Sequence, residues 1–227
     1  MFTIKKGFGL ALAGVAALTI QGTATASAAT VPAATVDPKA GCIEPAETST
    51  AKSSVWQAFA RFGDIADYFL APGGDFETGA KGWNLSNAAV VRGNESFGIT
   101  RGSQSLQLGS GLLSVATAVS PAFCVTDAHP TFRFVARPRG LVGVLSTFVR
   151  YQAVDGTTRE EQVHSRSRLT LLPGFWSPSE LQPLATKVPM AKVGGVASVR
   201  LVFRAPINVV GAGYQIDSLL VDPYRSR

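Results

Sequence analysis

From Asp75 to the C-terminus, the sequence is a succession of short segments in which apolar and polar residues alternate or β-branched residues cluster. One such segment alternates with a period of two, which places Phe132 and Phe134 on one face of a strand and Arg133 on the other. Turn residues separate the segments. The predicted strands are residues 88–92, 105–108, 112–119, 131–136, 142–154, 159–169, 196–204 and 214–221.

About eight strands without long helices between them predict a fold in which two antiparallel sheets pack face to face. The dipeptide Asp155-Gly156 is typical of a hairpin turn between two of these strands. The predicted fold class is therefore all-β, a two-sheet antiparallel β-sandwich of the jelly-roll type over residues 73–227. A domain of this size buries about 70% of the surface of its unfolded chain, so its core does not depend on a bound metal.

The segment before the sandwich, residues 53–72, has a different period. Its large apolar residues recur at spacings of three and four, which predicts a short amphipathic helical segment. Ser53 or Ser54 is the candidate N-cap, Gly63 leaves open a division into two short turns, and Pro72 ends the segment. The apolar residues are Trp56, Phe59, Phe62, Ile65 and Phe69.

The N-terminus carries the features of a secretory signal peptide. Lys5 and Lys6 precede an apolar run over residues 7–20, which is too short to span a bilayer, and Ala26-Ser27-Ala28 suits signal peptidase. We therefore expect residues 1–28 to be removed and the protein to be secreted, either extracellular or associated with the cell surface, with no membrane segment after cleavage. Residues 29–52, which include Cys42, have the composition of a low-complexity leader.

Charge argues against nucleic acid as a partner. The formal net charge of +6 falls to +4 when Lys5 and Lys6 are removed with residues 1–28, since 6 − 2 = 4. The arginines are spread singly between apolar residues, whereas nucleic-acid binding requires a dense basic stripe with aromatic residues. An anionic cell-wall polymer stays a candidate partner at this mild charge.

The chain has two cysteines, Cys42 and Cys124, and in an exported protein they are expected to form one disulfide. Closing so long a loop stabilises a fold by roughly 4–5 kcal/mol at most. The alternatives are a lipoprotein cysteine and a catalytic thiol. Cys42 lies too far downstream for a lipoprotein cysteine, and a catalytic thiol would require His129 or His164 as its partner.

Three acidic residues suggest an oxygen-rich site. Asp75 and Glu77 flank Phe76, so in an extended segment both carboxylates project to one side. Asp217 interrupts an apolar strand, and a carboxylate there needs a cation or several hydrogen-bond donors. If the strands are adjacent, these residues would form a site suited to calcium.

Several further motifs stand out along the chain. They are Ala71-Pro72-Gly73-Gly74-Asp75-Phe76-Glu77-Thr78-Gly79, Gly82-Trp83, residues 102–108, residues 120–125, Ile216-Asp217-Ser218-Leu219 and residues 221–225. Together they look like the galactose-binding-like jelly roll, and in particular like carbohydrate-binding modules that begin FE-x-G-x-x-GW and close with IDD-V. The stretch 73–227 also resembles a group of uncharacterised secreted actinobacterial proteins.

The resemblance implies one structural calcium ion away from the sugar site. Its ligands would be a main-chain oxygen of Asp75, the Glu77 side chain, an oxygen near Ser103 and the Asp217 carboxylate. Ser218 departs from the pattern, because the modules commonly have a second acid there. The alternative is an acid cluster held by hydrogen bonds or by arginine, without a metal.

In such modules, sugars stack on exposed aromatic rings. The resemblance assigns Trp83 and Trp176 to the core, which leaves Tyr151, beside Arg150, as the best candidate for an exposed ligand platform. No strip of aromatic residues comparable to that of a cellulose or xylan binder is present.

Signs of catalysis are weak. The sequence lacks Gly-x-Ser-x-Gly, and we interpret His129 and His164 as exposed residues without a catalytic role. Glu160 and Glu161 are adjacent and point to opposite faces of a strand, unlike the facing carboxylates of a glycosidase. The sequence therefore predicts a secreted, non-catalytic binding module for a glycan or cell-wall polysaccharide. The alternative is a structural or interaction protein of the cell envelope or spore surface.

Overall fold

In the computed structural model, the described part of the chain comprises residue 42 and residues 55–109, 115–140, 142–169, 174–205 and 213–222. The predicted signal peptide (1–28) lies outside these residues, as does the predicted leader (29–52) apart from Cys42.

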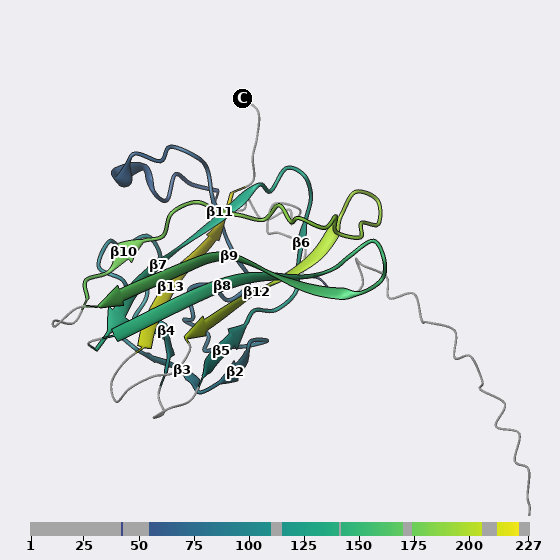
Figure 1. Ribbon diagram of the computed structural model, residues 1–227. Helices are drawn as coiled ribbons and strands as arrows, with labels where there is room; N and C mark the ends of the chain where they lie inside the picture. The colour runs from purple at the N-terminus through teal and green to yellow at the C-terminus, as the bar shows by residue number, and fades with distance from the viewer. Residues whose placement is uncertain are drawn as a thin grey trace, which may run out of the picture. The chain divides into compact units, whose positions relative to one another are not determined.

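The described domain consists of two antiparallel sheets that form a sandwich (Figure 1). We call them the β13 sheet and the β12 sheet after their central strands. The β13 sheet has the order β10 (Ser177–Pro178), β7 (Thr131–Arg139), β13 (Gly213–Val221), β4 (Gln104–Leu108) and β3 (Ala88–Arg92), with β1 (Phe69–Leu70) paired to β13 and β11 (Gln182–Pro183) to β7. The β12 sheet has the order β2 (Asn84–Ser86), β5 (Ala116–Val119), β12 (Ala197–Ala205), β8 (Val142–Gln152) and β9 (Thr158–Leu169), with β6 (Phe123–Val125) paired to β12.

The core lies between the two sheets, and the predicted alternation identifies its residues. Phe132 and Phe134 of β7 are buried on the inner face, as are Leu201 and Phe203 of β12. The rings of Phe134 and Phe203 meet edge to face, with their centroids 5.2 Å apart. The predicted all-β sandwich is therefore confirmed.

The predicted strands correspond to β3, β4, β5, β7, β8, β9, β12 and β13, with ends that differ by a few residues. Residues 112–114 of the predicted strand 112–119 lie outside the described residues. The hairpin between β8 and β9 turns where predicted, with Gly156 at φ +79° and its N–H donating to the carbonyl of Ala153 at 2.9 Å. The short strands β1, β2, β6, β10 and β11 were not predicted, because two or three residues are too few to show a period.

The structure of the N-terminal segment differs from the amphipathic helical segment predicted for residues 53–72. Over its described residues, 55–72, the only helical element is a 3-10 turn, Ala60–Phe62, which ends at Gly63 with φ +85°. Trp56 and Tyr68 exchange main-chain hydrogen bonds of 3.0 and 2.9 Å, so the segment closes on itself as a loop before β1. No helix in the described part of the chain combines the length and hydrophobicity needed to cross a membrane.

Aromatic residues of this segment pack on the outer face of the β13 sheet, although they do not belong to a helix. Phe59 and Tyr68 are fully buried there against Val135 and Leu220. Their rings meet edge to face at 5.1 Å. Burial against the sheet accounts for Phe59 and, in part, Trp56, whereas Phe62 and Ile65 are 37% and 70% exposed. The N-terminal segment covers the outer sheet face around Val135 and Leu220.

The predicted disulfide joins Cys42 to Cys124, whose Cα atoms are 5.3 Å apart and which are separated by 82 residues in sequence. Cys124 belongs to β6, so the bond attaches the start of the domain to the β12 sheet. Since the sulfur atoms are joined, neither cysteine is a free catalytic thiol.

Candidate functional site

Glu77 lies in a cradle of main-chain amides. Its Oε1 accepts the N–H groups of Ser103 at 2.8 Å and Gln104 at 2.7 Å. A Cβ atom on Gly102 would lie 2.2 Å from the Glu77 carboxyl group, so the cradle requires glycine at that position. Asp75 directs Oδ1 to the N–H of Glu77, at 3.3 Å, within its own turn. Ser103 therefore contributes a main-chain donor to Glu77.

Asp217 is fully buried on the outer side of β13, opposite Val135 of β7. Its two carboxylate oxygens accept the N–H groups of Glu95, at 2.9 Å, and of Ser218, at 2.7 Å. Burial raises the pKa of Asp217 to about 7, and the negative charges of Glu95 and Glu77 act in the same direction. Ser218, at the position of the missing second acid, shares a hydrogen bond of 2.6 Å with Thr100.

Glu95 was not identified from the sequence, and it is a buried acid whose main-chain N–H donates to Asp217. Its carboxylate accepts the N–H groups of Phe97 and Ile99, both at 2.5 Å. The signal that indicated Asp217, a carboxylate inside an apolar strand, is absent at Glu95 because it lies in a polar loop.

The negative charge of the predicted ligands Glu77 and Asp217, and of Glu95, would suit a cation, since no lysine or arginine of the described residues forms an ion pair with them. The positions of their side chains suit a metal ion less well. Within the described ranges, no three His, Cys, Asp or Glu side chains are close enough together to hold a metal ion. Main-chain oxygens would have to supply the remaining ligands.

The predicted ligand platform of Tyr151 and Arg150 needs correction. Tyr151 is 3% exposed, and its hydroxyl lies within hydrogen-bond distance of Glu161 and of the Val188 carbonyl. Arg150 lies on the other face of β8, where its Nε and Nη2 donate to Glu160 at 3.0 and 2.8 Å. Consecutive residues of a strand point to opposite faces, so these two side chains cannot form one site.

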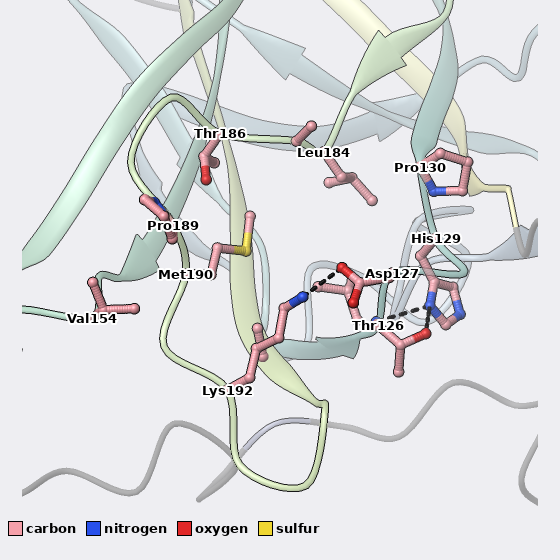
Figure 2. A pocket seen from close by; sticks show the side chains of 13 residues that line it. Thr126, Asp127, His129, Pro130, Val154, Leu184, Thr186, Pro189, Met190 and Lys192 are labelled. Carbon is pink, nitrogen blue, oxygen red and sulfur yellow. Dashed lines mark hydrogen bonds and ion pairs between the residues drawn. The ribbon is translucent and has the colours of Figure 1, made fainter.

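A pocket of about 660 Å³ opens at the end of the sandwich where β7 begins (Figure 2). The turn that follows β6, the loop after β11 and the β8–β9 hairpin surround it. Its walls are mostly apolar, and its volume lies in the range of ligand-binding pockets, roughly 300–1,000 Å³. The apolar residues are Val125, Pro130, Val154, Leu184, Ala185, Pro189, Met190 and Ala197, and the polar ones are Thr126, Asp127, His129, Thr186 and Lys192.

Polar groups gather at one side of this pocket. Lys192 forms an ion pair with Asp127, which connects the loop after β11 to the turn after β6 (Figure 2). His129, expected to be exposed, is buried, and its Nδ1 accepts the N–H of Thr126 at 3.0 Å. A neutral ring with an accepting Nδ1 carries its proton on Nε2. The pocket was not predicted, because its walls come from three segments that are distant in sequence.

No protein-family model matches the sequence, and no curated protein matches it. Among solved structures, the enzymatically active domain of tailspike protein 4 from bacteriophage CBA120 has a TM-score of 0.44 at 12% identity, over 67% of this chain and 21% of that chain. The C-terminal family 22 carbohydrate binding module of Clostridium thermocellum Xyn10B has a TM-score of 0.43 at 12% identity, over 70% and 95% of the two chains. TmCBM61 in complex with β-1,4-galactotriose has a TM-score of 0.39 at 17% identity, over 68% and 97%. These values describe a likeness of backbone arrangement alone.

Proposed function

We propose that this protein is a non-catalytic glycan-binding module whose pocket holds one sugar unit. The observation that carries the proposal is the composition of the pocket, in which apolar walls face a polar rim. A sugar ring presents C–H groups on its faces and hydroxyl groups at its edge. Met190 and Leu184 offer contact to the C–H groups, and the Asp127 carboxylate and Lys192 ammonium offer an acceptor and donors to hydroxyl groups.

The pocket residues support binding without catalysis. Hydrolysis of a glycosidic bond by the usual route requires two carboxyl groups that flank the bond. Among the described residues that line the pocket, Asp127 is the only carboxylate, and it is paired with Lys192. The Nδ1 of His129 is engaged by the turn that contains it.

The test is a titration of the full chain with a panel of neutral and acidic oligosaccharides by isothermal calorimetry. Met190→Ala and Asp127→Asn should each weaken binding of any ligand found. Ile65→Ala is the control, because Ile65 is exposed and does not line the pocket. No binding to any sugar, or equal binding by all variants, would contradict the proposal.

A second candidate function is a structural or interaction protein of the cell envelope or spore surface. Its support is a pair of exposed apolar side chains beside the short edge strands, Phe175 at 84% and Leu181 at 54% exposure. Exposed apolar residues at a sheet edge favour contact with another protein. Crosslinking in the source cells would test it: a reproducible partner that Phe175→Ser abolishes supports it, and a monomer without partners contradicts it.

The secreted location stays a proposal that rests on residues 1–28. We expect the mature chain in the medium or on the cell surface, beginning after Ala28. Mass spectrometry of the N-terminus checks this, and a chain that retains residues 1–28 in the cell would contradict it.

We also propose that one calcium ion binds near Glu77 and Asp217, with main-chain oxygens near Asp75 and Ser103. The support is that Glu77 and Glu95 lie near enough to Asp217 to raise its pKa, and that none of the three forms an ion pair with a lysine or arginine among the described residues. Calcium at a hundredfold excess over its dissociation constant would add about 2.7 kcal/mol of stability. Melting curves with calcium and with chelator should therefore separate for the wild type and for Glu180→Gln, and should coincide for Glu77→Gln. Coincident curves for the wild type would contradict the proposal.

A further inference from the structure

The part of the outer β13 sheet face that the N-terminal segment leaves open carries two arginines. Arg137 and Arg139 occupy alternate positions of β7, so both side chains lie on this face. We call them the arginine pair. Gln215 of β13 lies directly opposite Arg137, and Gln107 of β4 lies opposite Gln215 on the other side. The pair and Gln107 therefore form one polar surface, with Gln215 buried between them.

Each guanidinium is held in place by a glutamine. Arg137 donates through Nε to the Oε1 of Gln215, and Arg139 donates through Nη1 to the Oε1 of Gln107. The Arg137 guanidinium also lies over the ring of Trp176, 4.8 Å from its centroid. Gln215 is 2% exposed, so the acceptor that holds Arg137 is rigidly packed. The surface is thus built before any ligand arrives.

The charge of the arginine pair is not matched within the described residues. No carboxylate there forms an ion pair with either arginine, whereas Arg150 and Arg204 on the other sheet share Glu160. The segments 110–114, 141, 170–173 and 206–212 contain no Asp or Glu. Burial lowers the pKa of Arg137, and the charge of Arg139 lowers it further, as expected for two cations in close proximity.

We propose that the arginine pair binds the carboxylate groups of an acidic polysaccharide, a polymer of uronic acid residues. A planar guanidinium matches a carboxylate and can bind it through two parallel hydrogen bonds. Because Oε1 of the half-buried Gln107 faces Arg139, its NH₂ group is the end left to donate to a sugar hydroxyl. The small exposed side chain of Ala89 on β3 keeps the face open beside Gln107.

This site is distinct from the pocket. Pro130, which lines the pocket, precedes β7, and Arg139 ends that strand. Nine residue steps of extended chain separate them, roughly 30 Å. Binding at the arginine pair therefore does not depend on the pocket. A negative result at one site leaves the proposal for the other site intact.

The experiment measures binding of the full chain to polygalacturonate and to the same polymer after methyl esterification, which removes its charge. The wild type should bind the free acid and not the ester. The double variant Arg137→Gln/Arg139→Gln should lose at least about tenfold in affinity, because hydrogen bonds between charged groups are broken. Arg101→Gln/Arg200→Gln is the matched control: both of its arginines are exposed and it removes the same charge.

The control should bind within about twofold of the wild type, since distant exposed charges are screened by salt. No binding to polygalacturonate, equal binding to the ester, or an equal loss in the control variant would each overturn the proposal. Binding of DNA with the same dependence on the arginine pair would also overturn it, because the site would then recognise any polyanion. Arg139→Gln alone, at an exposed position, provides a second test if the double variant melts early, and it should still weaken binding.

Discussion

Replacement of Asp64 by Asn removes the negative charge that faces Arg133 where the N-terminal segment meets the β13 sheet. The Nη1 of Arg133 lies 2.6 Å from Oδ2 of Asp64, and the two side chains are only 10% and 17% exposed. The Nε and Nη2 of Arg133 donate to the Ser179 carbonyl at 3.0 and 2.6 Å. The guanidinium also lies 4.3 Å from the centroid of the Phe59 ring. The variant therefore leaves a mostly buried positive charge without its carboxylate.

Loss of one partner of a buried ion pair costs about 3–5 kcal/mol. Asp64 keeps some contact with solvent, so we expect Asp64→Asn to lower the free energy of unfolding by about 3 kcal/mol, the lower end of that range. Arg133→Met removes the charge itself and keeps an apolar stem over Phe59. The double variant should therefore be no less stable than Asp64→Asn alone, with a coupling energy of about 2 kcal/mol between the two sites.

Urea unfolding of the oxidised protein, followed by tryptophan fluorescence, measures all four members of this cycle. A coupling energy below about 0.5 kcal/mol, the value of an exposed pair, would refute the reasoning. It would mean that the N-terminal segment is attached by its aromatic residues alone, with no contribution from the ion pair.

The same pair predicts a dependence on pH. Burial by itself would raise the pKa of Asp64, but hydrogen bonds from Tyr68, Arg133 and the Ala66 amide outweigh it and leave the pKa lowered. A lowered pKa in the folded state contributes stability that is fully present above the unfolded value and is lost as the pH falls through the folded value. Stability should therefore decline more steeply below pH ~4 in the wild type than in Asp64→Asn, and equal slopes would contradict this.

Three further predictions concern stability. The double variant C42A/C124A should lose about 4–5 kcal/mol in urea unfolding, because the bond closes a long loop, and a loss below about 1 kcal/mol would contradict the loop-entropy argument. Gly102→Ala should lower the free energy of unfolding by about 1–3 kcal/mol, and with it the melting temperature, because the new methyl group collides with the Glu77 carboxyl group. An unchanged melting temperature would show that the Glu77 side chain can move aside without loss of stability. Phe203→Ala should cost about 3–5 kcal/mol by leaving a core cavity, while Phe175→Ala, at an exposed ring, should be silent in the same assay.

The sequence by itself determined the sandwich and the composition of its core. Alternation with a period of two is a local property, so Phe132 and Phe134 could be assigned to one face of a strand, opposite Arg133, without knowledge of their neighbours. The turn at Asp155-Gly156 was predictable because this dipeptide is typical of hairpin turns. The disulfide was predictable because the chain has two cysteines.

Only the tertiary structure decided which surfaces are covered and which groups meet. The apolar spacing around Phe59 suits a helix, yet Phe59 is buried because a loop packs on the β13 sheet. Glu95, in a loop, contacts Asp217 of β13, and Gln107 and Gln215 hold the arginine pair across strands that are distant in sequence. Such contacts depend on the order and register of strands, which sequence periodicity does not encode, because each strand satisfies its own alternation against any apolar partner.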